Sequence, residues 1–262
     1  EIGEEALSLW PRDELLEDVV WVIRMYRPQV IVSVFSGTPR DGHGQHQAAG
    51  IMAREAFEAA ADPNRFPEQL ELGVEAWAPD KLYMSSRRRF FDPGGEAEEG
   101  AIDVETGVRD PLLGRSFHQL AMESRSQHRS QDMGASQPLG PRDASLILQR
   151  TAPGVDAAPG DGVFAGVDTA LATRLGVLPA APAAAADPAL RRYREALAAA
   201  RDGLNALKPW EAVPALAEAL EQLRVVREAV DEIGGSPDAE GAAAIGEAAG
   251  ASTSELRAVL AH

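Results

Sequence analysis

The sequence predicts an α/β protein, with a Rossmann-like, mostly parallel sheet sandwiched by helices and a C-terminal helical appendage. Three observations support this prediction. Residues 12–27 carry apolar side chains at helical spacing, residues 30–35 are almost continuously apolar, and a helical pattern resumes at His46. An apolar strand without alternation is typical of burial on both faces, as in a parallel sheet. Helix, strand, loop and helix in this order form half of a doubly wound unit.

The composition is that of a globular protein with an acidic surface. A hydrophobic fraction of 45% in 262 residues is enough for a substantial core. The formal net charge of −16 would repel a phosphate backbone, so we expect no nucleic-acid binding. The chain has no cysteine, so a metal would be held by His, Asp and Glu. No apolar run approaches the roughly 18 residues of a membrane-spanning helix, so we expect no transmembrane segment.

Further elements follow from turn residues and apolar periodicity. Residues 1–11 are expected to be a connector, and Pro28 ends the first helix. The other expected elements are helix 46–61, loop 62–79, strand 81–85, strand 101–105, helix 114–130, strand 146–148 and helix 169–175. A basic run at 87–89 is expected to be a solvated strand end, with an anion subsite as the alternative.

The composition changes at Pro179. An Ala/Pro-rich linker is expected at 179–187, and alanine-rich amphipathic helices at about 188–207, about 210–233 and from Ser254. We therefore divide the chain into a domain at 1–178, a linker at 179–187 and a helical appendage at 188–262.

Residues 40–47 hold two of the five histidines, His43 and His46, in a glycine-containing loop between the expected strand and helix. Two imidazoles at this spacing can converge on one point. Zinc accepts histidine and carboxylate ligands where thiolates are absent, and a second imidazole can stabilise a developing oxyanion. By spacing alone, a surface loop whose polar residues cap a helix explains the pattern equally well.

Residues 27–32 (R-P-Q-V-I-V), followed by 41–49 (D-G-H-G-Q-H-Q-A-A), resemble the PIG-L/LmbE-like family of zinc-dependent N-deacetylases. Residues 128–131 (H-R-S-Q) resemble a second family element on a later helix. The resemblance covers about residues 1–178. Residues 124–131 and 164–168 resemble the branch of larger members that are often exported, which implies a periplasmic or extracellular location.

The resemblance implies a role for each matching residue. His46 matches a zinc ligand, and His43 matches the histidine that polarises the acetyl carbonyl. Asp41 would hold an imidazole tautomer from behind. His128, Gln131 and Arg40 would line or brace the substrate pocket, with bracing of a helix end as the alternative for His128 and Gln131.

The family's first motif, A-H-P-D-D-E, supplies the remaining metal ligands and the general base, and it is absent from this sequence. We therefore expect the chain to be the C-terminal part of a hydrolase that uses Zn²⁺, or another divalent metal, to remove acetyl from an N-acetylated sugar, a glycan or a related amine. The alternative is a non-catalytic carbohydrate-binding or scaffolding relative. A third interpretation gives the C-terminal helices a role in self-association.

Overall fold

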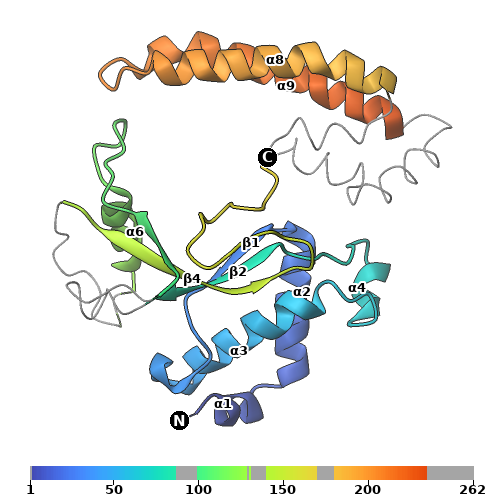
Figure 1. Cartoon of the computed structure of the whole chain (residues 1–262), viewed down its shortest axis with the longest axis vertical. Coiled ribbons are helices and arrows are strands. Elements are labelled where there is room, and N and C mark those ends of the chain that lie inside the picture. Colours follow the sequence, from blue (N-terminus) through green and yellow to red (C-terminus); the bar gives the residue numbers. More distant parts are fainter. Residues whose placement is uncertain (1, 87–98, 129, 131–139, 170–179, 235–262) are drawn as a thin grey trace. The chain divides into compact units, whose positions relative to one another are not determined.

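A computed structural model of the chain describes residues 2–86, 99–128, 130, 140–169 and 180–234 (Figure 1). The chain divides into two compact units, residues 1–110 with 115–167, and residues 111–114 with 168–262. The first unit contains the sheet and the second contains two long helices. The expected helix at 169–175, apart from its first residue, lies outside the described residues, as do the expected helix from Ser254 and the basic run at 87–89.

The first unit is built on a mixed sheet of four strands in the order β1-β2-β4-β3. The strands are Val30–Ser33 (β1), Lys81–Ser86 (β2), Ala101–Glu105 (β3) and Asp143–Thr151 (β4). β1 runs parallel to β2, whereas β4 runs antiparallel to both β2 and β3. The α/β class is therefore confirmed, but the described sheet is mixed rather than mostly parallel, because β4 runs back along β2.

β1 lies at an edge of the described sheet, and its side chains are only partly buried, which corrects the expectation of a strand buried on both faces. Val32 is 48% exposed and Val34, just beyond the strand, is 56% exposed. The apolar run alone could not reveal this position, because an edge strand and a central strand can share one composition.

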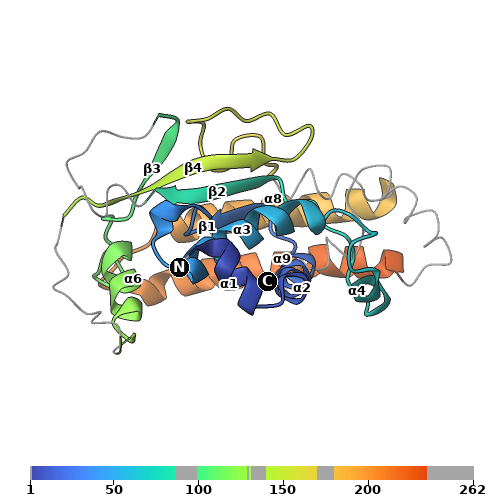
Figure 2. The same ribbon diagram turned by 90° about the horizontal axis from the view of Figure 1, so that it is seen from below.

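Three helices pack together on one face of this sheet: Gly3–Leu9 (α1), Arg12–Tyr26 (α2) and Gly44–Ala59 (α3) (Figure 2). Their buried side chains form the core: Ala6, Leu7, Leu16, Val20, Ile23, Ala48, Met52, Ala56, Ala59 and Ala60. The small alanines let α3 approach its neighbours closely. α1 replaces the expected connector, and a short helix, Pro67–Glu71 (α4), lies within the expected loop at 62–79.

Arg24, at the end of α2, is fully buried and holds the segment that follows α3. Its guanidinium donates to the side-chain oxygen of Gln69 at 3.1 Å and to the carbonyls of Ala59, Ala60, Asp62, Arg65 and Phe66. Burial lowers the pKa of Arg24, an effect that Asp62 and Glu68 oppose. This guanidinium satisfies carbonyls that would otherwise be buried without a partner.

Side chains alternate along β2, so Lys81 and Tyr83 share one face of the strand. The fully buried Lys81 ammonium donates to the Val163 carbonyl at 3.1 Å and to the Gly162 carbonyl at 3.4 Å. Tyr83 donates to the same Val163 carbonyl at 3.5 Å. These bonds tie the segment around residue 163 to the sheet.

The helix Phe117–Arg125 (α6) also belongs to the first unit and is shorter than the expected 114–130. It begins at a capping box in which Ser116 and Gln119 bond each other's backbone N–H groups.

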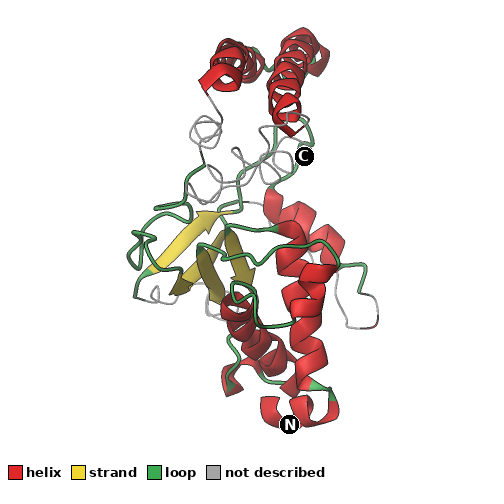
Figure 3. Ribbon diagram, turned by 90° about the vertical axis from the view of Figure 1, so that its right-hand side faces the viewer, coloured by secondary structure: helices red, strands yellow, loops and turns green. Residues whose placement is uncertain are grey.

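The second unit is a helical hairpin of Ala180–Asp202 (α8) and Val213–Gly234 (α9), joined through the 3₁₀ helix Pro209–Ala212 (η3) (Figure 3). α8 begins inside the expected linker at 179–187, because alanine favours helix strongly enough to extend the helix through this stretch. Among the described residues, no helix is long and apolar enough to cross a membrane.

Candidate functional site

The histidine loop, defined as residues 36–46, leaves β1 and enters α3 through the 3₁₀ helix Pro39–Asp41 (η1). The Asp41 side chain organises it from inside, with only 4% of the residue exposed. Its carboxylate accepts from the backbone N–H groups of Ser36 at 3.1 Å, Gly37 at 2.7 Å and Thr38 at 3.3 Å, and from the Ser36 hydroxyl at 3.0 Å. These four bonds hold the loop in one conformation.

His46 is oriented by the backbone of the same aspartate. Its Nδ1 lies 3.2 Å from the Asp41 carbonyl oxygen. Because a carbonyl can only accept, Nδ1 carries the proton, and Nε2 of the neutral ring presents its lone pair. The ring also stacks on Phe35, with centroids 4.2 Å apart and an interplanar angle of 11°. A histidine held in this way is prepared to bind a metal or accept a proton at Nε2.

His43 occupies the N-cap position of α3, yet its side chain makes no capping hydrogen bond. Its exposed ring meets the His46 ring edge-on, with centroids 5.3 Å apart at 79°. The structure thus brings the two imidazoles together. It offers no support for helix capping as the role of His43.

The start of α1 packs against this loop. The Gln47 side chain donates to the Gly42 carbonyl at 3.1 Å and accepts from the Gly3 N–H at 3.0 Å. Gly44 has no room for a side chain, since a Cβ there would lie 2.9 Å from the Ile2 carbonyl oxygen. Residues 2–3 therefore lie beside the two histidines.

The other predicted site residues are placed less centrally. Arg40 is exposed on η1. His128 is exposed, and its Nδ1 bonds the Arg125 carbonyl at 3.2 Å, so its described contact braces the end of α6. Gln131 lies outside the described residues. The Asp41 contact with an imidazole is made by its backbone carbonyl, while its carboxylate braces the loop.

The imidazole nitrogens of His43 and His46 are donors of the type that zinc accepts, but they are too few for a zinc site. Within the described ranges, no group of three or more His, Asp or Glu side chains is placed to hold a metal ion. A catalytic zinc site uses three protein ligands. His46 supplies one well-oriented nitrogen, and His43 lies next to it, so the described residues do not complete a zinc site.

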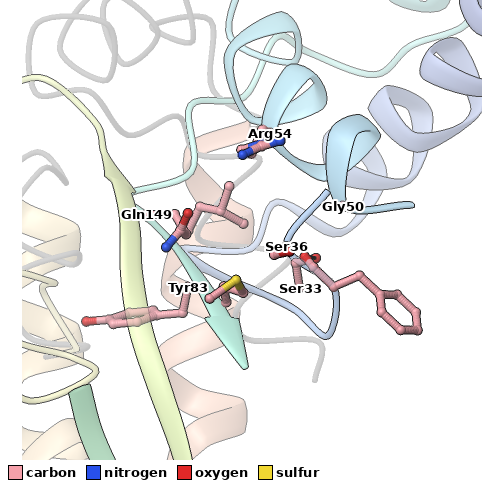
Figure 4. A pocket seen from close by; sticks show the side chains of 9 residues that line it. Ser33, Ser36, Gly50, Arg54, Tyr83 and Gln149 are labelled. Carbon is pink, nitrogen blue, oxygen red and sulfur yellow. Dashed lines mark hydrogen bonds between the residues drawn. The ribbon is translucent and has the colours of Figure 1, made fainter. Parts of the chain in front are cut away.

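A small pocket lies beside the histidine loop, between β1, β2, β4 and α3 (Figure 4). Its polar lining includes Arg54 and Gln149, two residues that the sequence did not single out. No motif joins residues 95 positions apart, and only the pairing of β4 with β2 brings Gln149 to α3.

The fold and the site together define an α/β protein with a paired-imidazole loop at the end of its edge strand. No protein family, curated protein or solved structure matches the chain.

Proposed function

We propose that the histidine loop is part of the active site of a metal-dependent hydrolase that removes an acetyl group from an N-acetylated sugar or a related amine. The observation that carries this proposal is the hydrogen bond from His46 Nδ1 to the Asp41 carbonyl, which leaves Nε2 available beside His43. The resemblance of residues 27–32 and 41–49 to the PIG-L/LmbE-like deacetylases supports the same chemistry.

In this proposal the two imidazoles have different roles. His46 is the metal ligand, because its ring is fixed on one side by Phe35 and at Nδ1 by the Asp41 carbonyl. His43, exposed and next to it, donates a hydrogen bond to the oxyanion that forms when the amide carbonyl is attacked. When bound, zinc supplies Lewis-acid activation of water and of the amide carbonyl.

The missing ligands require a partner segment. We propose that the working protein is a Rossmann-like sandwich in which a further strand lies along β1, carrying the remaining carboxylate and histidine ligands. The position of β1 at the edge of the described sheet supports this, because an edge strand is a favourable surface for strand addition. The exposed Val32 and Val34 add apolar area that a further segment would cover.

The test uses the complete gene product. We expect acetate release from N-acetylglucosamine or its oligomers, abolished by a chelator and restored by Zn²⁺. His46→Ala should lose bound zinc as measured by elemental analysis, because it removes a ligand. His43→Ala should keep zinc and lose about 10²–10³-fold in turnover.

Gln45→Ala is the matched control, since Gln45 is exposed in the same loop and has no assigned role. It should keep wild-type zinc content and turnover. An equal zinc content in His46→Ala and the wild type would contradict the assignment of His46. The absence of zinc binding and of acetate release in the wild type would refute the proposal as a whole.

The incomplete ligand set among the described residues favours a second candidate, a non-catalytic carbohydrate-binding or scaffolding module. For this function, glycan binding should persist in the presence of a chelator and in His46→Ala. If the chelator or the His46→Ala substitution abolishes binding on a glycan array, the second candidate is ruled out.

A further inference from the structure

We propose that Arg54 and Gln149 form a binding site for a small oxyanion group, a carboxylate or a phosphate, in the pocket beside the histidine loop. Arg54 comes from α3 and Gln149 from β4, and both line the same pocket (Figure 4). The proposal does not depend on hydrolase activity and assigns these residues a role of their own.

Arg54 is half-buried, yet its guanidinium makes no hydrogen bond or ion pair with any residue that the structure describes. Arginine is seldom buried without a partner, because its charge loses hydration. Arg24, which is fully buried in the same unit, shows the usual outcome, with its five N–H donors used by protein acceptors. Arg54 therefore keeps its donors available for a ligand.

The carboxylates near Arg54 are engaged elsewhere. Glu58, one helical turn away, pairs with Arg150 at 3.7 Å, and Glu55 pairs with Arg12. The Asp41 carboxylate already accepts four hydrogen bonds within the histidine loop. Although the chain has 41 acidic and 25 basic residues, Arg54 forms no ion pair with a described carboxylate.

The position of the guanidinium is fixed by close packing. A Cβ on Gly50 would lie 2.1 Å from the backbone nitrogen of Gly37, so α3 lies directly against the histidine loop. A Cβ on Gly37 would lie 2.6 Å from Arg54 Nη2, which places the guanidinium over that glycine. Two glycines thus make the space in which Arg54 lies, next to the carboxyl end of β1.

The rest of the pocket selects an oxyanion of small size. The Gln149 side chain is half-buried and hydrogen-bonds no described residue, so its amide group is available to a ligand in the pocket. Leu82 and Met84 provide an apolar floor. The pocket has about 10 Å³ of space for solvent, room for one water-sized group. It therefore takes one oxygen of a carboxylate or phosphate and leaves the remainder of the ligand outside.

The test titrates the purified chain with sodium phosphate, and separately with sodium acetate, at constant ionic strength. Binding is followed by NMR through the Arg54 Nε–H and Gln149 amide signals. We expect saturable shifts of both signals with at least one of the two anions. Saturation by phosphate alone would identify a phosphate site, and saturation by acetate alone would identify a carboxylate site.

Arg54→Gln should weaken binding by about tenfold or more, because a hydrogen-bonded charge is removed. Arg54→Lys keeps the charge but loses the planar fork, so its affinity should fall between those of Arg54→Gln and the wild type. Arg109→Gln, at an exposed arginine of the same unit away from the pocket, is the matched control and should bind like the wild type.

Equal affinity in Arg54→Gln and the wild type would overturn the proposal, as would an equal loss in Arg109→Gln. If Arg54→Gln does not fold, the wild-type titration decides alone, because unmoved Arg54 and Gln149 signals with both anions would exclude the site.

Discussion

The ring of His46 and the backbone carbonyl of Asp41 are joined by a hydrogen bond of 3.2 Å, which determines the nitrogen that faces a ligand. The carboxylate of the same Asp41 accepts hydrogen bonds from three backbone N–H groups of the loop. One residue thus shapes the loop with its side chain and orients the imidazole with its main chain. The geometry of the site therefore depends on both the carboxylate and the backbone carbonyl of Asp41.

The neutral ring of His46 should carry its proton on Nδ1. Nitrogen–proton correlation NMR of ¹⁵N-labelled protein distinguishes the two tautomers of the neutral ring. His43 provides the internal comparison, since its exposed ring forms no hydrogen bond with a described residue. A proton found on Nε2 of His46 would contradict the described orientation.

Asp41→Ala should lower the free energy of unfolding by about 2–4 kcal/mol, because it leaves one buried and two partly buried N–H groups without this acceptor. Asp41→Asn should cost less, since its amide oxygen still accepts. Urea denaturation followed by circular dichroism measures both. A change for Asp41→Ala within about 0.5 kcal/mol of zero, as at an ordinary surface position, would show that the carboxylate does not hold the loop.

Gly50→Ala should destabilise the protein, against the usual trend. Replacing a helical glycine by alanine commonly stabilises by about 1 kcal/mol. Here the added Cβ would lie 2.1 Å from the Gly37 nitrogen, so overpacking should reverse the sign, with a net loss of about 1–3 kcal/mol. Gly162→Ala is the control, because a Cβ there has no neighbour within 4 Å. A stabilised Gly50→Ala would mean that α3 and the loop are not in close contact.

His118, in α6, should make stability depend on pH. Burial, with a smaller contribution from Arg142, lowers the pKa of its ring below the ordinary value of 6.5. The unfolded state therefore binds the proton more readily, so stability is complete above about pH 6.5 and falls as the pH drops towards the folded-state pKa. His118→Gln should reduce this slope in urea denaturation between about pH 8 and about pH 5. An equal slope in His118→Gln and the wild type would contradict this role of His118.

Much of the local structure could be predicted from the chain. Apolar spacing over residues 12–27 predicted α2, and Pro28 its end, because periodicity and proline act within a few residues. The strand at 81–85 and the helices expected at about 188–207 and about 210–233 were predicted for the same reason. The prediction of a connector at residues 1–11 was wrong, because this segment forms α1. α1 is stabilised by packing on α3 rather than by a strong apolar periodicity of its own.

What the sequence by itself determined is the α/β class and the loop that carries His43 and His46 between a strand and a helix. Local side-chain chemistry suffices for this. Tertiary structure alone decided that β4 runs antiparallel to β2, that His46 presents Nε2, and that Arg54 and Gln149 line the same pocket. These features depend on residues brought together from distant positions, or on the tautomer that one carbonyl selects. No local pattern encodes such contacts, because they exist only once the chain has packed.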